Sequence, residues 1–306
     1  MITNLSPASE AFIADVDRVQ RKVEEATRQV TSGKRVSVAS DAPNEIDTIL
    51  QLHTDEVRNA QIQENLGVAQ ADANAADGAL TSATKLMDRA TVLAAQGANF
   101  TVDATGRQNI AGEVQSLLDQ MTAISNTTVQ GRYVFGGDQD STPPYQVDPT
   151  AAYGVTRLTS SAATRKVESA DGGSFAVTQS AQDIFDSRNP DDTVASSNVF
   201  ASLNSLRLAL LANDSTQIAA ASASVQLASD HLNTAQAFYG TVENRITDAT
   251  NYGANYDVQL QTELSQKEDA DVTSAALAIT QGNTQLEAAF QMQAKMPHTS
   301  LFDFMG

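Results

Sequence analysis

Small and apolar residues recur every seven positions in two neighbouring rows, once in the first half of the chain and again in the second. The first-half rows comprise Leu66, Ala73, Leu80, Met87 and Ala94 and, beside them, Ala69, Ala76, Ala83 and Ala90. The second-half rows comprise Ile218, Val225, Leu232, Tyr239, Ile246, Gly253 and Leu260 and, beside them, Ala221, Ala228, Ala235, Val242, Ala249 and Tyr256. Two such rows form an a/d seam, which predicts long helices packed side by side. A helix from Asn44 to Asn99 would be about 80 Å long.

Further helices are predicted on either side of these seams. The spacing of apolar residues favours a helix through Ile110–Ile124 that runs back antiparallel beside the first long one. It also favours helices over Val199–Leu210 and Val272–Phe290. Gly33 is expected to end the first helix of the chain, and Pro297 to stop the last.

The helical pattern is interrupted between Gly131 and Pro190, where four of the seven prolines fall. In this stretch Arg165–Ser169 and Ser174–Thr178 flank Asp171-Gly172-Gly173, which predicts a β-hairpin with a glycine turn. The middle of the chain is therefore expected to be a small β-rich insert between helical regions.

The predicted fold class is mainly α. A long coiled-coil or helical-bundle rod would be formed by the N- and C-terminal regions, with a small β-rich inserted domain. We divide the chain into a terminal coiled-coil domain (residues 1–36 and 268–306), a helical rod domain (37–131 and 196–267) and an outer insert (132–195).

Composition excludes several classes of function. The 306 residues contain no cysteine, so disulfides and thiolate metal sites are ruled out. The formal net charge of −18 makes nucleic acid and anionic membrane poor partners. No apolar stretch approaches the length of a membrane-spanning helix, and no cleaved signal peptide is recognisable. Aromatic residues make up only 5% of the chain, which favours closely packed helices over a compact enzyme core.

Both ends of the chain carry a heptad seam without a partner close in sequence. Residues 1–36 have six basic and five acidic side chains, whereas residues 265–306 have two basic and five acidic ones. A single narrow seam is marginally stable in water, so we expect the ends to become ordered on assembly. Burial inside their own domain is the alternative. The predicted assembly residues are Leu5, Phe12, Val16, Val19, Val23, Ile279, Leu286, Phe290, Leu301 and Phe302.

No residue set predicts catalytic, cofactor or metal chemistry. The three histidines lack the spacing of metal ligands. The stretch from Asp138 to Asp140 could begin a calcium loop, but Pro143 stands at the sixth position, where such loops need glycine. The carboxylates of Glu268–Asp271 precede a helix, where capping explains them better than acid–base chemistry does.

Several motifs carry a family resemblance. The run Thr31–Val36 followed by Ser40–Pro43 resembles the N-terminal signature of bacterial flagellins and their relatives, with Gly33, Arg35, Asp41 and Pro43 as its matching residues. Glu268–Asp271, Leu286–Phe290, Ser300–Asp303 and Asn244–Ile246 resemble the C-terminal part of that family. The segment from Gly131 to Gly137, with Tyr133, Phe135, Gly136 and Gly137, is similar to the hook–filament junction members of the family. Flagellins usually have Asn-Gly and a leucine pair there.

The resemblance implies a structural subunit of the bacterial flagellum and no enzyme activity. It implies an extracellular protein that leaves the cell without a cleaved signal peptide, through the flagellar type III export apparatus, with the help of an export chaperone. It also implies three neighbours in the flagellum: the first hook-associated protein, flagellin, and further copies of the same chain in a ring.

Two other functions remain open. The chain could be a flagellin, which would share the fold and the terminal motifs but not the Tyr133–Gly137 segment. It could also host an enzyme site in the insert, which would need paired carboxylates in a cleft. The acidic residues available there are Asp183, Asp186, Asp191 and Asp192.

Overall fold

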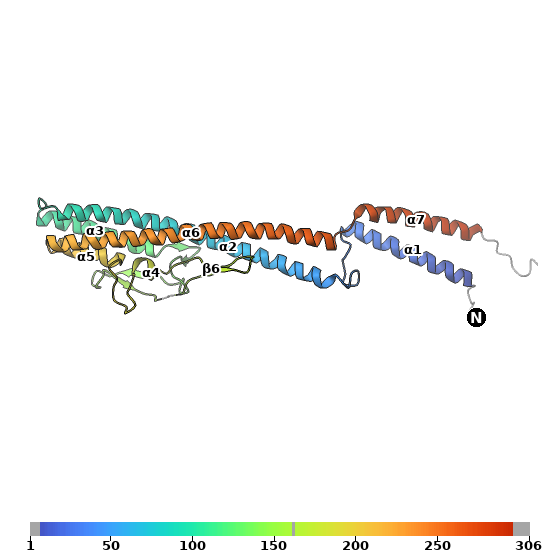
Figure 1. Cartoon of the computed structure of the whole chain (residues 1–306), viewed down its shortest axis with the longest axis horizontal. Coiled ribbons are helices and arrows are strands. Elements are labelled where there is room, and N and C mark those ends of the chain that lie inside the picture. Colours follow the sequence, from blue (N-terminus) through green and yellow to red (C-terminus); the bar gives the residue numbers. More distant parts are fainter. Residues whose placement is uncertain (1–6, 161–162, 296–306) are drawn as a thin grey trace, which may run out of the picture. The chain divides into compact units, whose positions relative to one another are not determined.

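The computed structural model describes residues 7–160 and 163–295. Within them the chain forms seven helices and six short strands (Figure 1). The helices are α1 (Pro7–Ser32), α2 (Ile46–Ala98), α3 (Ala104–Ser125), α4 (Ala181–Phe185), α5 (Val199–Leu211), α6 (Ser215–Glu268) and α7 (Val272–Lys295). The strands are β1 (Thr128–Val129), β2 (Arg132–Tyr133), β3 (Tyr145–Val147), β4 (Val155–Arg157), β5 (Lys166–Glu168) and β6 (Ser174–Ala176). The predicted mainly α fold with a β-rich insert is confirmed.

The chain divides into two compact units. One contains the residues up to 58 together with those from 257 onward, and the other contains residues 59–256. The second unit holds α3, α5, most of α2 and α6, and the insert, and a continuous apolar cluster joins them. The three-part division drawn from the sequence stays a prediction.

The inner helices of residues 59–256 pack in antiparallel pairs. Arg89 on α2 donates through Nε to Glu113 on α3 at 2.7 Å, and Arg107 donates to the carbonyl of Gly97 at 2.9 Å. These pairs run in opposite directions along the two helices, which confirms the predicted antiparallel return. Gln236 on α6 likewise donates to Thr81 on α2 at 2.9 Å.

The seven-residue rows become the core of this bundle. Their side chains are almost completely buried, and alanine lets the helices approach closely. The most deeply buried members of the rows are Leu66, Ala73, Ala76, Leu80, Ala83, Met87, Ala90, Ala94, Ile218, Val225, Ala228, Leu232 and Tyr239.

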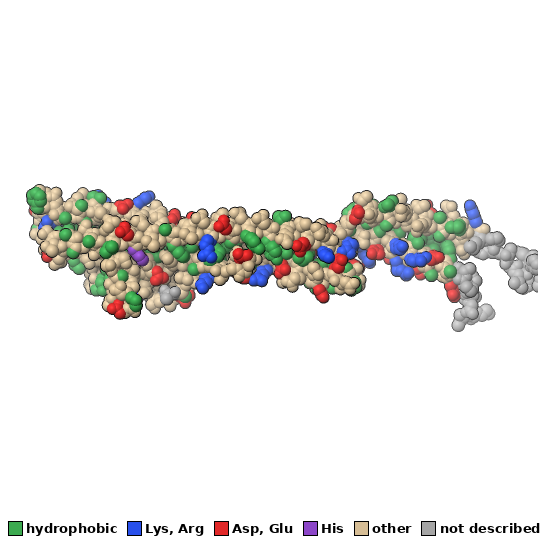
Figure 2. All heavy atoms as spheres, in the orientation of Figure 1, with side chains coloured by type: hydrophobic (Ala, Val, Ile, Leu, Met, Phe, Trp, Pro, Cys, Tyr) green, Lys and Arg blue, Asp and Glu red, His purple; other side chains and the backbone are tan. Residues whose placement is uncertain are grey.

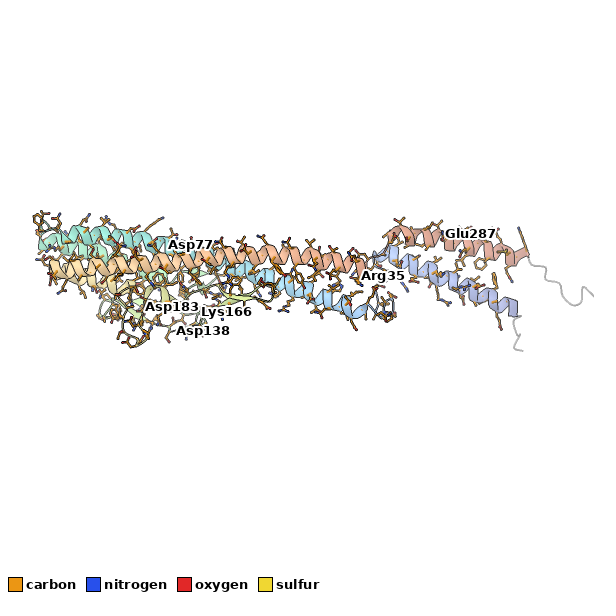
Figure 3. The ribbon with its side chains drawn as sticks, viewed as in Figure 1. Arg35, Asp77, Asp138, Lys166, Asp183 and Glu287 are labelled. Carbon is orange, nitrogen blue, oxygen red and sulfur yellow. The ribbon has the colours of Figure 1, made fainter. Side chains whose placement is uncertain are left out.

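The insert and the residues just before it contain three separate two-stranded antiparallel sheets and the short helix α4. Its predicted hairpin is present, with Val167 opposite Phe175 and Gly172 at φ +84° in the turn. The β3–β4 hairpin and α4 were not anticipated from the sequence. Figure 3 marks the insert with the labels of Asp138, Lys166 and Asp183.

An aromatic cluster attaches the insert to the bundle. The ring of Phe135 meets those of Phe185 and Tyr239 edge-on, with centroids 5.5 and 6.3 Å apart. Phe200 on α5 stacks on Phe185, and its centroid lies 4.9 Å from that of Tyr145. Such contacts supply large apolar area in a chain that has few aromatic residues.

Candidate assembly interface

Helices α1 and α7 pack against each other along their length (Figure 1), and hydrophobic side chains gather where they face each other (Figure 2). The side of α7 that faces α1 follows strict four-three spacing. Its members are Ala275, Ile279, Gly282, Leu286, Ala289 and Gln293, all buried or half-buried. On α1 the corresponding members are Phe12, Val16, Val19, Val23 and Ala26.

The two helices approach each other closely at Gly282. A Cβ atom built on Gly282 would collide with Cγ2 of Val23. The backbone of α7 therefore lies directly against that side chain, which only glycine permits without a shift. Among the described residues of the two helices, the buried ones are Ala26, Ala275 and Gly282.

An apolar groove remains open along this pair. It has a volume of ≈ 270 Å³, and its walls include Phe12 and Val16 of α1 and Leu286, Ala289 and Met292 of α7. Met292 is 65% exposed. The pair thus presents apolar surface that its own two helices do not cover.

The predicted assembly residues fall into three groups. Five of them, Phe12, Val16, Val19, Val23 and Leu286, lie between α1 and α7, as does the half-buried Ile279. Phe290 does not, because it lies one residue beyond Ala289, which holds the seam position, and it is 53% exposed. Leu5, Leu301 and Phe302 lie outside the described residues.

The segment after α1 is tied to the segment between α6 and α7. Gly33, at φ +71°, ends α1 as predicted, and its carbonyl accepts from the N–H of Ala270 at 2.9 Å. The N–H of Arg35 donates to the carbonyl of Glu268 at 2.6 Å. The Arg35 guanidinium, labelled in Figure 3, also donates to the carbonyl of Lys267 at 2.6 Å. Because these bonds join residues far apart in sequence, they fix where α1 and α7 begin to pair.

Side-chain charges reinforce this connection. The Nζ atom of Lys34 lies 2.6 Å from Oε1 of Glu268. His53 lies 3.2 Å from the other carboxylate oxygen of Glu268 and 3.4 Å from Glu56. The sequence predicted a surface or bundle-flank role for His53 and gave no sign of this contact, because the partner is 215 residues away.

Three carboxylates shape the turns around this connection. The N–H groups of Ser37 and Val38 both donate to Asp41 at 3.0 Å and hold the pKa of Asp41 below its usual 3.8. The hydrogen bond from Arg35 lowers the pKa of Glu45 from its usual 4.5. The N–H of Ser274 donates to Asp271 at 3.0 Å and lowers the pKa of that carboxyl. Asp271 therefore caps α7, in line with the capping interpretation of the acidic run.

Pro43 is exposed in the connection that leads into α2. It follows the Asp41 turn by two residues and precedes the first helical residue, Ile46. A proline is compatible with this place because no helix hydrogen bond is lost there.

The Tyr133–Gly137 segment is built into the bundle. Tyr133 lies in β2, and its N–H donates to the carbonyl of Asp140 at 2.7 Å. Phe135 is 1% exposed at the centre of the aromatic cluster, and its carbonyl accepts from the N–H of Ala181. A Cβ on Gly136 would lie 2.9 Å from the Asp140 backbone, and Gly137 has φ +62°. Both positions require glycine, which explains in structural terms why the segment ends in two glycines.

A buried ion network that sequence reasoning missed connects the insert to α2. Asp72 is 5% exposed, and Arg165 donates to its Oδ2 at 3.0 Å. Arg132 lies 3.6 Å from the same oxygen. Asp72 and Arg165 are 93 residues apart, so no local pattern could have paired them.

The four acidic residues considered for an enzyme site in the insert all have partners. Asp186 accepts hydrogen bonds from Tyr145, Arg188 and Asn198. Asp183 accepts from Ser180, and Asp191 accepts from Thr193. Asp192 lies 3.4 Å from Arg188. This arrangement gives the enzyme hypothesis no support, because no pair of these carboxylates is left to face a substrate.

Within the described residues, no three His, Asp or Glu side chains converge in a way that could hold a metal ion. None of the described helices is long and apolar enough to cross a bilayer.

Comparison with known proteins identifies the class. The family model described as the bacterial flagellin N-terminal helical region matches residues 4–140, and that of the bacterial flagellin C-terminal helical region matches residues 222–305. The chain belongs to the bacterial flagellin family. It is therefore a structural component of the bacterial flagellum.

Individual relatives narrow the comparison. Flagellar hook-associated protein 3 of Escherichia coli is 25% identical over 291 residues, which cover 90% of each chain. The crystal structure of flagellar hook-associated protein-3 from Legionella pneumophila aligns with a TM-score of 0.60 at 14% identity, covering 72% of this chain and 98% of that one. FlgL of Xanthomonas campestris aligns with a TM-score of 0.58 at 18% identity, covering 69% of this chain and 98% of that one. At these identities the two solved structures support the fold.

Proposed function

We propose that this chain is the flagellar subunit that joins the hook-associated zone to the filament. The observation that carries the proposal is its similarity to a flagellar hook-associated protein 3 over 90% of both chains. The Tyr133–Gly137 segment supports it further, because it is similar to that of the junction members of the family. In this chain the packing requires Phe135 and Gly136, and a positive φ requires Gly137.

Assembly would use the α1–α7 pair. The open groove beside Phe12 and Leu286, together with the exposed Phe290 and Met292, offers apolar surface to neighbouring subunits. Burying such surface is the main driving force of protein association. The proposed neighbours are the first hook-associated protein, flagellin and further copies of this chain in a ring.

Delivery to the flagellum would follow the family's route. The chain would pass through the type III export apparatus without a cleaved signal peptide, accompanied by an export chaperone. A sparsely buried α1–α7 pair suits this route, since little stability has to be given up at the ends during transit.

A deletion strain tests the junction role. Removing the gene should leave hooks intact and release unassembled flagellin into the medium, and a plasmid copy of the wild-type gene should restore filaments. Filaments of normal number and length in the deletion strain would contradict the proposal.

Polymerisation of the purified chain separates the junction role from that of a filament subunit. A junction subunit should form at most short rings or remain monomeric when it is seeded onto hook-associated caps without flagellin. Long filaments grown from this chain alone, seen by electron microscopy, would favour the flagellin alternative.

A further inference from the structure

One of the two rows in the α2 seam contains a single polar side chain. Its buried row runs Leu52, Asn59, Leu66, Ala73, Leu80, Met87 and Ala94 at seven-residue spacing. Asn59 is 2% exposed, as deeply buried as its apolar neighbours in the row. A buried asparagine in an a/d row lowers stability, so its presence at this level of the seam has a cost.

The seam of α6 contains a single glycine, and it lies opposite Asn59. The Nδ2 atom of Asn59 donates to the carbonyl of Gly253 at 2.9 Å. A Cβ on Gly253 would collide with Nε2 of Gln63 and would lie 3.1 Å from Oδ1 of Asn59. Asn59 and Gly253 therefore form one layer without apolar side chains, which we call the Asn59–Gly253 layer.

This layer also leaves a polar atom without a partner. Oδ1 of Asn59 is buried and has no hydrogen-bond partner among the described residues. Leaving a buried acceptor unpaired costs the desolvation of that group, and glycine contributes no side chain to offset it. The layer thus weakens the contact between α2 and α6 locally.

The main apolar cluster ends at the same level. On α2 its first member is Ile62, and on α6 its last member is Ala249. In the second rows, seven residues beyond these ends, stand the half-buried Asp55 and Tyr256. Buried apolar residues resume further out, as Ile49, Leu52, Leu260 and Leu264, but they lie outside the main cluster.

We propose that the Asn59–Gly253 layer separates two cooperative units within α2 and α6. Residues 46–58 and 257–268 open and close as one unit, while the seam from Ile62 to Ala94 stays folded. Because apolar contact is interrupted at the layer, opening of the outer segments removes few contacts from the main cluster. The layer thereby insulates the main core from changes at the outer ends of both helices.

Native-state hydrogen exchange in increasing denaturant tests this on the full chain. Amides of residues 46–58 and 257–268 should share one opening free energy, with a step to stronger protection at Asn59 and at Gly253. Simple fraying of helix ends would instead give protection that rises gradually along each helix. A gradual rise, or one common opening free energy for all of α2, would overturn the proposal.

A substitution of Asn59 tests the role of the layer more directly. Asn59→Leu should join the two apolar clusters, slow exchange of residues 46–58 and 257–268 by about tenfold, and remove the step. The matched control is Asn65→Leu, the same change on the exposed face of α2, which should leave the step in place. Equal effects of the two variants, or a step unchanged in Asn59→Leu, would contradict the role of the layer. If Asn59→Leu does not fold, the wild-type profile alone still decides.

Discussion

The α1–α7 pair and the inner bundle are built from the same seven-residue pattern, but they bury it to different degrees. In the bundle, Leu66, Leu80 and Met87 are fully buried because several helices and the insert surround each row. In the pair, Phe12 and Leu286 are only half-buried and border an open groove. The difference shows that a heptad seam predicts a contact surface, whereas the number of helices around it decides whether the contact is complete.

This difference in burial leads to a difference in stability between the bundle and the pair. Burial contributes roughly 25 cal/mol for each Å² of apolar surface, so fully covered rows stabilise the bundle far more than half-covered rows stabilise the pair. Two isolated helices are marginal in water unless further surface is buried. We therefore expect the bundle to fold in the monomer and the pair to gain its stability on assembly.

Removing a buried side chain of the bundle should change the free energy of unfolding more than any other substitution considered. Leu80→Ala should lower the free energy of unfolding by about 3 kcal/mol, because it leaves a cavity in a fully packed row. Val19→Ala, on the half-exposed seam of α1, should change it by less than about 1 kcal/mol. Urea unfolding followed by circular dichroism measures both. Similar losses in the two variants would remove the proposed difference between the regions.

The ion network that anchors the insert should have the next largest effect. Asp72→Asn leaves Arg165 without its carboxylate, and Nε and Nη2 of Arg165 already lack partners among the described residues. We expect a loss of about 2 kcal/mol, because a partly buried charge becomes uncompensated. Asp88→Asn, at an exposed position of α2, makes the same charge change and should be nearly neutral. A neutral Asp72→Asn would show that the network does not hold the insert in place.

Two glycine substitutions test the close approach in the pair. Gly67 has open space at its Cβ position, so Gly67→Ala should stabilise α2 by about 0.5–1 kcal/mol through helix propensity. Gly282→Ala should not show this gain, because the new Cβ meets Val23. In the deletion strain, Gly67→Ala should restore filaments fully and Gly282→Ala only partly. Full restoration by both variants would mean that α1 and α7 need not approach this closely.

Acidification should have the smallest effect, and within the α1–α7 pair it should act at the connection between the two helices. The folded-state pKa values of Asp41, Glu45 and Asp271 are lowered, so their stabilising contribution is complete above the ordinary values of 3.8 and 4.5 and is lost as the pH falls through the lowered ones. Below about pH 4 the caps and turns around Asp41 and Asp271 should loosen. Amide NMR signals of Ser37, Val38 and Ser274 should report it, and signals that stay unchanged until the chain unfolds globally in acid would refute it.

Much of the fold could be predicted from the sequence because it depends on local spacing. The α2 and α6 rows, the Asp171–Gly173 turn and the glycine that ends α1 all appear at their expected places. The Asp72–Arg165 pair could not be predicted, since it joins residues 93 positions apart.

The predicted assembly residues of α1 and α7 stay a prediction, but the structure shows how the two helices meet. The residues predicted on α7 are Ile279, Leu286 and Phe290, all large, whereas the backbone of the small residue Gly282 lies directly against Val23. A signal was present, because Ala275, Gly282 and Ala289 recur every seven positions as small residues. Close helix packing requires small residues at the contact, so such a row deserved the same weight as the large ones.

Limited proteolysis with mass spectrometry, on the dilute monomer and on the assembled flagellum, tests the central claim most directly. Cleavage in the monomer should fall within α1 and α7 while residues 62–249 stay intact, and the same sites should be protected after assembly. Terminal helices that resist protease in the monomer as well as the bundle does would contradict the account.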